Sequence, residues 1–317
     1  MALARQHIDE CVHGHKRCKR LSPPSPLLPT RLVDCSDPAL PRLVLTTGER
    51  GEYIALSYVW GEEKPYQTAI SSGVSIYEHG IASSILPQTV RDAISVTHAL
   101  GFQYLWVDTL CIIQEDDADR RHEIGHMPHI YRHAHLTIFA ASAKSASEGF
   151  LHQRPPQQSN VVLPFICPPP PPSSMGIPAT HSTAQLQLGQ VHLASIDSAR
   201  ASYSDELGVM ATRAWCMQEY LMSPRALIFT PTRLLFSCRT TMQGVGNSFG
   251  SMDDEPQLPD MLFLRNPPVA KPGSKEWKDM HRAWTKVVMD YSRRRATFES
   301  DKLVACAAVA QQFAHWS

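Results

Sequence analysis

Signatures of several large protein classes are missing from this sequence. Lysine plus arginine and aspartate plus glutamate number 30 each, so no excess of one charge indicates a nucleic-acid or anionic-membrane surface. No apolar run approaches the length that spans a bilayer, and the polar, basic amino-terminal stretch lacks the apolar core of a signal peptide. Eight cysteines in 317 residues fall far below the density of a disulfide scaffold. We therefore expect a soluble, cytoplasmic protein with no nucleic-acid or membrane partner.

The fingerprints of the common nucleotide-binding folds are also missing. No G-x-G-x-x-G follows a predicted strand, and no G-x4-G-K-[ST] occurs. His122, His126 and His129 could share one helix face, as metal ligands would, but Pro128 intervenes. We expect that face to be solvated rather than to bind a metal.

The amino-terminal segment, residues 1–50, contains Cys11, His13, His15 and Cys18. Thiolate and imidazole suit zinc, but the pattern C-x-H-x-H-x2-C is too compressed for a zinc finger, and no second ligand pair follows at finger spacing. The residues therefore indicate a surface segment with incidental cysteines, and we predict no metal site and no cofactor.

From Glu52 onwards, predicted strands and helices alternate. Apolar runs of strand length, two of them rich in β-branched and aromatic residues, cover residues 53–60, 104–108 and 136–141. Helices are expected over residues 86–100 and about 120–133, the second kinked or split by Pro128. Strands that are apolar on both faces and separated by helices indicate an α/β fold with a parallel sheet and right-handed crossovers.

The second half of the chain is less regular. Residues 152–207, with five consecutive prolines at 168–172, indicate a long insertion with little packed structure. A helix around Trp215 should stop at Ser223-Pro224, and the strands 226–230 and 233–238 form a predicted hairpin. Residues 240–273 are expected to be loop, followed by helices at about 274–293 and 300–316.

The stretch Arg213-Ala-Trp-Cys-Met-Gln-Glu219 places one carboxylate on a largely apolar helix. Such a helix should turn inward, yet glutamate is almost never fully buried unless it is paired. Two explanations stay open. Either an arginine, Arg213 or Arg225, neutralises Glu219, or Glu219 lines a cleft and takes part in chemistry.

Ligands of an open parallel sheet bind beyond the carboxyl ends of its strands. Trp60-Gly61 ends the first predicted strand and could present a flat ring beside a closely approaching backbone, or could simply cover the core. Asp108 ends the second strand and could bind a hydroxyl group or cap the next segment through a backbone N–H.

Several blocks of the sequence resemble, in order, the fungal heterokaryon incompatibility (HET) domain. They are Tyr53-x-Ala-Leu-Ser-Tyr-Val-Trp-Gly61, Leu86-Pro-x-Thr-Val-x-Asp-Ala93, Leu100-Gly-x-x-Tyr-Leu-Trp-Val-Asp-x-Leu-Cys-Ile-Ile-Gln114, Met127-x-x-Ile-Tyr131, Gly149-Phe-Leu151 and Arg213-x-Trp-x-x-Gln-Glu219. Tyr291-Ser-x-Arg and Asp301-Lys-Leu303 resemble the region that follows this domain. The resemblance implies a HET domain over residues 51–240, including the insertion, and a carboxyl-terminal loop and helical extension over 241–317. It also implies self/non-self recognition that ends in cell death, with self-association and an unknown recognition partner.

HET domains are in turn similar to TIR domains, which have a flavodoxin-like parallel sheet and some of which cleave NAD. Trp215-Cys-Met-Gln-Glu219 is similar to the plant TIR helix that supplies the catalytic glutamate. This second resemblance implies Glu219 as the catalytic residue and NAD as the substrate. Beside it we place Tyr58, Trp60, Gly61, Asp108 and Arg213 as substrate-binding residues. The alternative function is a non-enzymatic signalling module that acts by homotypic or partner association.

Overall fold

The structure is a computed structural model of the chain. It describes residues 1–21, 25–61, 79–154, 161–167, 187–193, 200–246, 251–253, 256–264, 271–296 and 299–314. The proline run at 168–172, within the predicted insertion, lies outside these residues.

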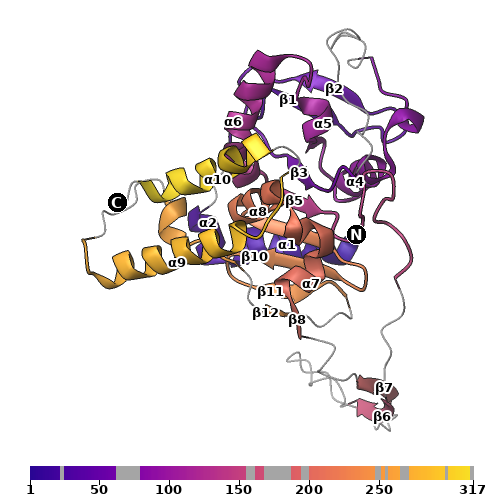
Figure 1. The fold of residues 1–317 in the computed structure, drawn as a ribbon. Coiled ribbons are helices and arrows are strands. Elements are labelled where there is room, and N and C mark those ends of the chain that lie inside the picture. The colour runs from indigo at the N-terminus through magenta and orange to yellow at the C-terminus, as the bar shows by residue number, and fades with distance from the viewer. Residues whose placement is uncertain are drawn as a thin grey trace, which may run out of the picture.

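An eight-stranded mixed sheet forms the centre of the protein, in the order β11-β10-β9-β5-β3-β4-β1-β2 (Figure 1). Its four central strands run parallel to one another, and both edges are completed by antiparallel pairs. The bounds are β1 Arg31–Asp34, β2 Arg42–Leu45, β3 Ile54–Ser57, β4 Tyr104–Trp106, β5 Leu136–Phe139, β9 Arg225–Phe229, β10 Leu234–Cys238 and β11 Met242–Gly244. The predicted α/β class with a largely parallel sheet is thereby confirmed.

The central strands are enclosed on both faces. Every residue of β3, β5 and β9 is buried. A strand covered on both sides by helices can be apolar throughout, and this is why these strands are recognisable in the sequence.

The helices between the central strands cover the two faces of the sheet. α4 (Gln88–Ala99) links β3 to β4, α5 (Asp108–Cys111) and α6 (Asp117–His133) link β4 to β5, and α8 (Ala214–Met222) precedes β9. Right-handed crossovers place α4 on one face and α6 and α8 on the other. α6 and α8 contact each other. α6 continues through Pro128 as one helix, so of the predicted kink or split, the split is wrong.

The amino-terminal residues contribute to this core. α1 (Ala2–Gly14) contacts β10, α2 (Lys16–Leu21) follows it, and β1 pairs with β4. Cys11 and Cys18 are 0% and 2% exposed, so the expected surface segment with incidental cysteines is wrong. The cysteines lie on the inward side of two short helices that the sheet covers.

The predicted insertion contains a hairpin and a short helix. β6 (Val161–Cys167) and β7 (Gln187–Leu193) form a separate antiparallel pair, which stands apart from the main sheet in Figure 1. β8 (Arg200–Ser202), α7 (Tyr203–Leu207) and the 3-10 helix η4 (Gly208–Thr212) lead back to α8. The described part of the insertion therefore has more structure than we expected.

The carboxyl-terminal elements follow the predicted order. β9 and β10 form the expected hairpin, and α9 (Lys275–Tyr291) and α10 (Glu299–Ala314) are the expected helices. The predicted loop also contains β11, β12 (Ser251–Asp253), which pairs with β8, and the 3-10 helix η5 (Asp260–Phe263). α10 packs against both α6 and α8. None of the described helices is long and apolar enough to cross a membrane.

The motif blocks contact one another in space. The carboxylate of Asp92 on α4 accepts the backbone N–H groups of Phe150 and Leu151 at 2.7 and 3.0 Å. The guanidinium of Arg294, which follows α9, donates to the carbonyl oxygen of Arg213 at 3.1 Å. Blocks that are distant in the sequence thus hold each other in place.

Candidate functional site

Glu219 lies at the carboxyl edge of the parallel strands, on a helix that is enclosed on nearly all sides. Eight of the nine residues of α8, Trp215 being the exception, are buried. The helix packs against α6 and α10, which shield a polar side chain near its end from most of the bulk water. Glu219 is 6% exposed.

The partner of this carboxylate is a serine. The hydroxyl of Ser57, the last residue of β3, donates to Oε2 of Glu219. Among the described residues, no arginine lies within ion-pair distance of Glu219. Of the two explanations left open for Glu219, the direct Glu–Arg pair is therefore not the one that the structure contains.

Burial raises the pKa of Glu219 from 4.5 to about 8, and the negative charge of Asp108 adds to that rise. The Ser57 hydrogen bond and the positive charge of Arg213 act in the opposite direction. Glu219 is consequently a neutral carboxylic acid at pH 7 that can lose its proton near physiological pH.

Asp108 is the second carboxylate of the site. Its Oδ2 accepts the indole N–H of Trp60 at 2.9 Å, and its Oδ1 accepts the backbone N–H of Thr109 at 2.7 Å. Burial raises its pKa to about 6, whereas these hydrogen bonds and Arg213 lower it. At pH 7 Asp108 is ionised and Glu219 is not, so the site holds one ionised carboxylate and one protonated carboxylic acid.

The two aromatic candidates occupy different environments. Tyr58 is 7% exposed, and its hydroxyl lies 2.9 Å from Oγ1 of Thr109. Trp60 is half-buried and packs partly against the core, so it reaches the surface beside Asp108. Of these two rings, Trp60 is the one with an accessible face.

Gly61 has a structural requirement of its own. Its φ is +91°, and a β-carbon built there would lie 2.7 Å from Cβ of Ser145, in the loop after β5. The carbonyl of Trp60 also accepts the N–H of Ala146 at 3.1 Å. Glycine is therefore needed where this turn approaches the neighbouring loop.

Replacing Gly61 by alanine should destabilise the fold more than the same change at Gly48. Gly48 has a similar φ of +79° but no atom within 4 Å of a built β-carbon. Gly48→Ala should therefore cost only the left-handed backbone penalty of about 1–2 kcal/mol. Gly61→Ala should add about 1–3 kcal/mol for the overlap with Ser145. Urea denaturation of both variants measures the difference, and equal midpoints would contradict this account of the turn.

The structure brings Trp60 and Asp108, from two separate strand ends, into one region with Glu219 and Arg213 from the α8 segment. Arg213 is half-buried just before α8, and it acts on both carboxylates through its charge. Ser57 and Thr109 were missed. A serine closing an otherwise apolar strand was the available signal for Ser57.

A cleft of about 490 Å³ lies elsewhere, towards the amino ends of the central strands. It is lined by Glu52 and His135, which precede β3 and β5, and by Arg132, His133 and Arg225 among others. None of the predicted site residues lines it.

Two short patterns in the sequence match hydrolase signatures, and the structure describes one of them in full. His122-Glu-Ile-Gly-His126 on α6 fits H-E-x-x-H, in which the glutamate must act beside the metal. Both histidines are exposed, as we expected of this face, whereas Glu123 is buried 3.6 Å from Arg31. Gly246-Asn-Ser-Phe-Gly250 fits G-x-S-x-G, but it follows the edge strand β11 and residues 247–250 lie outside the described residues.

A comparison with protein families identifies the class of this protein. Residues 53–219 match the family described as Heterokaryon incompatibility protein (HET), and the chain belongs to that family. The match begins at β3 and ends at Glu219, so it spans every residue of the site described above. The family implies a role in heterokaryon incompatibility and the associated cell-death signalling. Comparison with curated proteins and with solved structures found no match.

Proposed function

We propose that this HET domain hydrolyses NAD or a related nucleotide, with Glu219 as the catalytic carboxylate, and that this reaction drives fungal self/non-self cell death. The observation that carries the proposal is the pairing of Glu219 with Ser57, and not with an arginine, beside a second carboxylate at the carboxyl ends of β3 and β4. A carboxyl group that served only as a structural ion-pair partner would not need this arrangement.

The order of the central strands supports the same proposal. The parallel strands lie side by side in the order β4-β3-β5-β9. Numbered along the chain, this is the order 2-1-3-4, which is compatible with the flavodoxin-like arrangement that we propose for this domain. In such an order, ligands bind between the first and third parallel strands along the chain, which here are β3 and β5. Ser57 is the last residue of β3 and bonds to Glu219, which supports a role for Glu219 at this end of the sheet.

The reaction breaks the bond between the ribose carbon and the nicotinamide nitrogen, and the electron pair leaves with nicotinamide. Water then adds to the oxocarbenium-like ribose and loses a proton, giving ADP-ribose. Glu219, with a pKa near 8, would accept that proton or hold a ribose hydroxyl group. The ionised Asp108 would stabilise the developing positive charge, Trp60 would stack on a ring, and the backbone of Gly61 would lie beside the ligand.

The proposal predicts a loss of nicotinamide release in Glu219→Gln. The amide is isosteric with the neutral acid and should preserve the fold, but it cannot accept a proton, so turnover should fall by at least about 100-fold. Glu148→Gln, an exposed carboxylate in the loop after β5, is the matched control and should keep wild-type activity. Purified full-length protein would be assayed with NAD by chromatography of the released base.

The pH profile of kcat/KM adds a second readout. It should rise to a plateau above pH about 8, where Glu219 is ionised. Ser57→Ala should shift the rise to higher pH, because the serine hydrogen bond lowers the pKa of Glu219. Equal turnover in wild type and Glu219→Gln would remove Glu219 from the mechanism. If the wild type neither binds NAD nor turns it over, the proposal as a whole is contradicted.

A further inference from the structure

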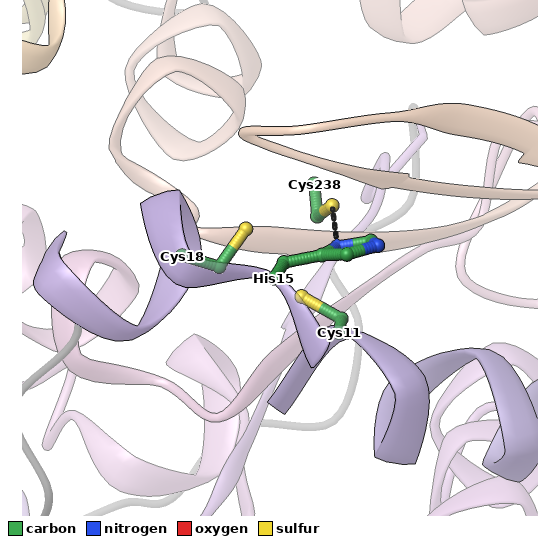
Figure 2. A group of neighbouring side chains, drawn as sticks. All are labelled: Cys11, His15, Cys18 and Cys238. Atoms are coloured by element: carbon green, nitrogen blue, oxygen red, sulfur yellow. Dashed lines mark hydrogen bonds between the residues drawn. The ribbon is translucent and has the colours of Figure 1, made fainter. Parts of the chain in front are cut away.

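Four potential metal ligands converge where the amino-terminal helices meet the sheet (Figure 2). The sulfur atoms of Cys11, Cys18 and Cys238 and a ring nitrogen of His15 all lie within 4.8 Å of one another. Cys11 is near the end of α1, His15 follows that helix, Cys18 is in α2, and Cys238 is the last residue of β10. Within the described part of the chain, no other group of three or more histidine, cysteine or acidic side chains is close enough to share an ion.

The composition of this cluster is that of a structural zinc site. Three thiolates and one imidazole form one of the closed tetrahedral sets that Zn²⁺ prefers, and soft sulfur ligands disfavour Mg²⁺ and Ca²⁺. The three cysteines are buried, and His15 is half-buried with its Nδ1 atom 3.4 Å from Sγ of Cys238. One disulfide would use two of the thiols and leave the third thiol and the imidazole without a role.

The surroundings supply hydrogen bonds to the sulfur atoms. Nε of Arg225 donates to Sγ of Cys11 at 3.3 Å, and the backbone N–H of Thr240 donates to Sγ of Cys238 at 3.4 Å. Oγ1 of Thr240 lies 3.3 Å from Sγ of Cys18. Groups of this kind orient metal ligands and stabilise thiolate charge, and the buried Arg225 offsets the net negative charge of a Zn²⁺ with three thiolates.

We propose that Cys11, His15, Cys18 and Cys238 bind one Zn²⁺ ion, which joins α1 and α2 to the end of β10. Each thiol loses its proton when the ion binds, and the binding free energy then stabilises the fold. α2 has only six residues, too few to be stable as an isolated helix, so a cross-link at Cys18 has a clear structural use.

This site differs from the one we rejected on the sequence alone. His13 is exposed and is not one of the four ligands. The fourth ligand, Cys238, is distant in the chain, so no local spacing pattern could include it.

The test is metal analysis of the purified full chain by inductively coupled plasma mass spectrometry. The expected result is one zinc per chain in the wild type. Changes to residues that only contact metal ligands lower metal affinity by about 10–100-fold. Cys238→Ser and His15→Ala remove a ligand itself, so each should lower the affinity by more than that. His13→Ala and Cys306→Ser are the matched controls, since neither residue belongs to the cluster, and both should retain the metal.

Two further measurements do not depend on the folding of a weakened variant. Wild-type protein reconstituted with Co²⁺ should show the visible absorption of a tetrahedral cobalt–thiolate centre. His15→Cys, which keeps four soft ligands, should retain zinc and the fold. Wild-type protein with negligible zinc and no cobalt spectrum would overturn the proposal. A disulfide within the cluster found by mass spectrometry, or full zinc content in Cys238→Ser, would do so equally.

Discussion

Replacing Arg31 by methionine is expected to lower the free energy of unfolding by about 3–5 kcal/mol, because it removes the counter-ion of the buried Glu123 and the partly buried Asp119. Arg31 is 5% exposed, and its guanidinium lies 2.6 Å from Asp119 and 3.6 Å from Glu123. Its Nε also donates to the carbonyl oxygen of Cys111 at 2.7 Å. One side chain from β1 thus fixes α5 and α6 together.

The matched control is Arg120→Met. Arg120 pairs with Asp117 at 2.7 Å on the same helix α6, but the two side chains are 47% and 70% exposed. Exposed pairs contribute about 0–1 kcal/mol, so this variant should unfold almost like the wild type. Chemical denaturation of both variants gives the comparison. A difference between them of less than about 1 kcal/mol would show that the Arg31 network does not act as a buried ion pair.

The second large effect concerns the pH dependence of stability. The pKa of Glu219 is about 8 in the folded chain against 4.5 for an ordinary glutamate. Between these values the folded state holds a proton that the unfolded state has lost, so the free energy of unfolding falls as pH rises. The slope is about 1.4 kcal/mol per pH unit for one proton. The contribution of Glu219 is therefore most favourable below pH 4.5 and is lost as pH rises to about 8.

Glu219→Gln should remove this component, since the amide does not titrate. The free energy of unfolding of both proteins would be measured by denaturation at several pH values from 5 to 9. Across this range the stability of the variant relative to wild type should increase by roughly 3–5 kcal/mol. Taking the difference cancels the titration of groups that do not interact with Glu219. Glu148→Gln, exposed to solvent, should show no such trend. A flat difference for Glu219→Gln would mean that Glu219 is ionised in the fold.

The central fold was readable from the sequence because burial on both faces leaves a continuous apolar signal in β3, β4 and β5. The amino-terminal helices were not, since α1 mixes charged residues with only three buried ones, Ala4, Ile8 and Cys11. The short strands β1 and β2 carry too few residues for a period to be visible.

The site could be predicted one residue at a time but not as a set of contacts. Glu219 is conspicuous as an acid among apolar residues, and the rule that ligands bind at the carboxyl ends of strands groups Trp60 with Asp108. The Ser57–Glu219 hydrogen bond joins residues 162 positions apart, which no local pattern encodes. The H-E-x-x-H match shows the converse. The pattern is complete in the sequence, yet Glu123 lies near Arg31 and the two histidines are exposed to solvent.

The strand order also determines when the chain can finish folding. β9, which completes the parallel part of the sheet, and β1, which closes its other side, both lie outside residues 53–219. A protein cut to those residues would expose the edges of β5 and β4, which invite pairing with other chains. During synthesis, the β5 edge stays open until the ribosome has released residues 225–229, and such long-range closure is slow. The part of the chain that is needed to complete the sheet is therefore longer than the segment that defines the family.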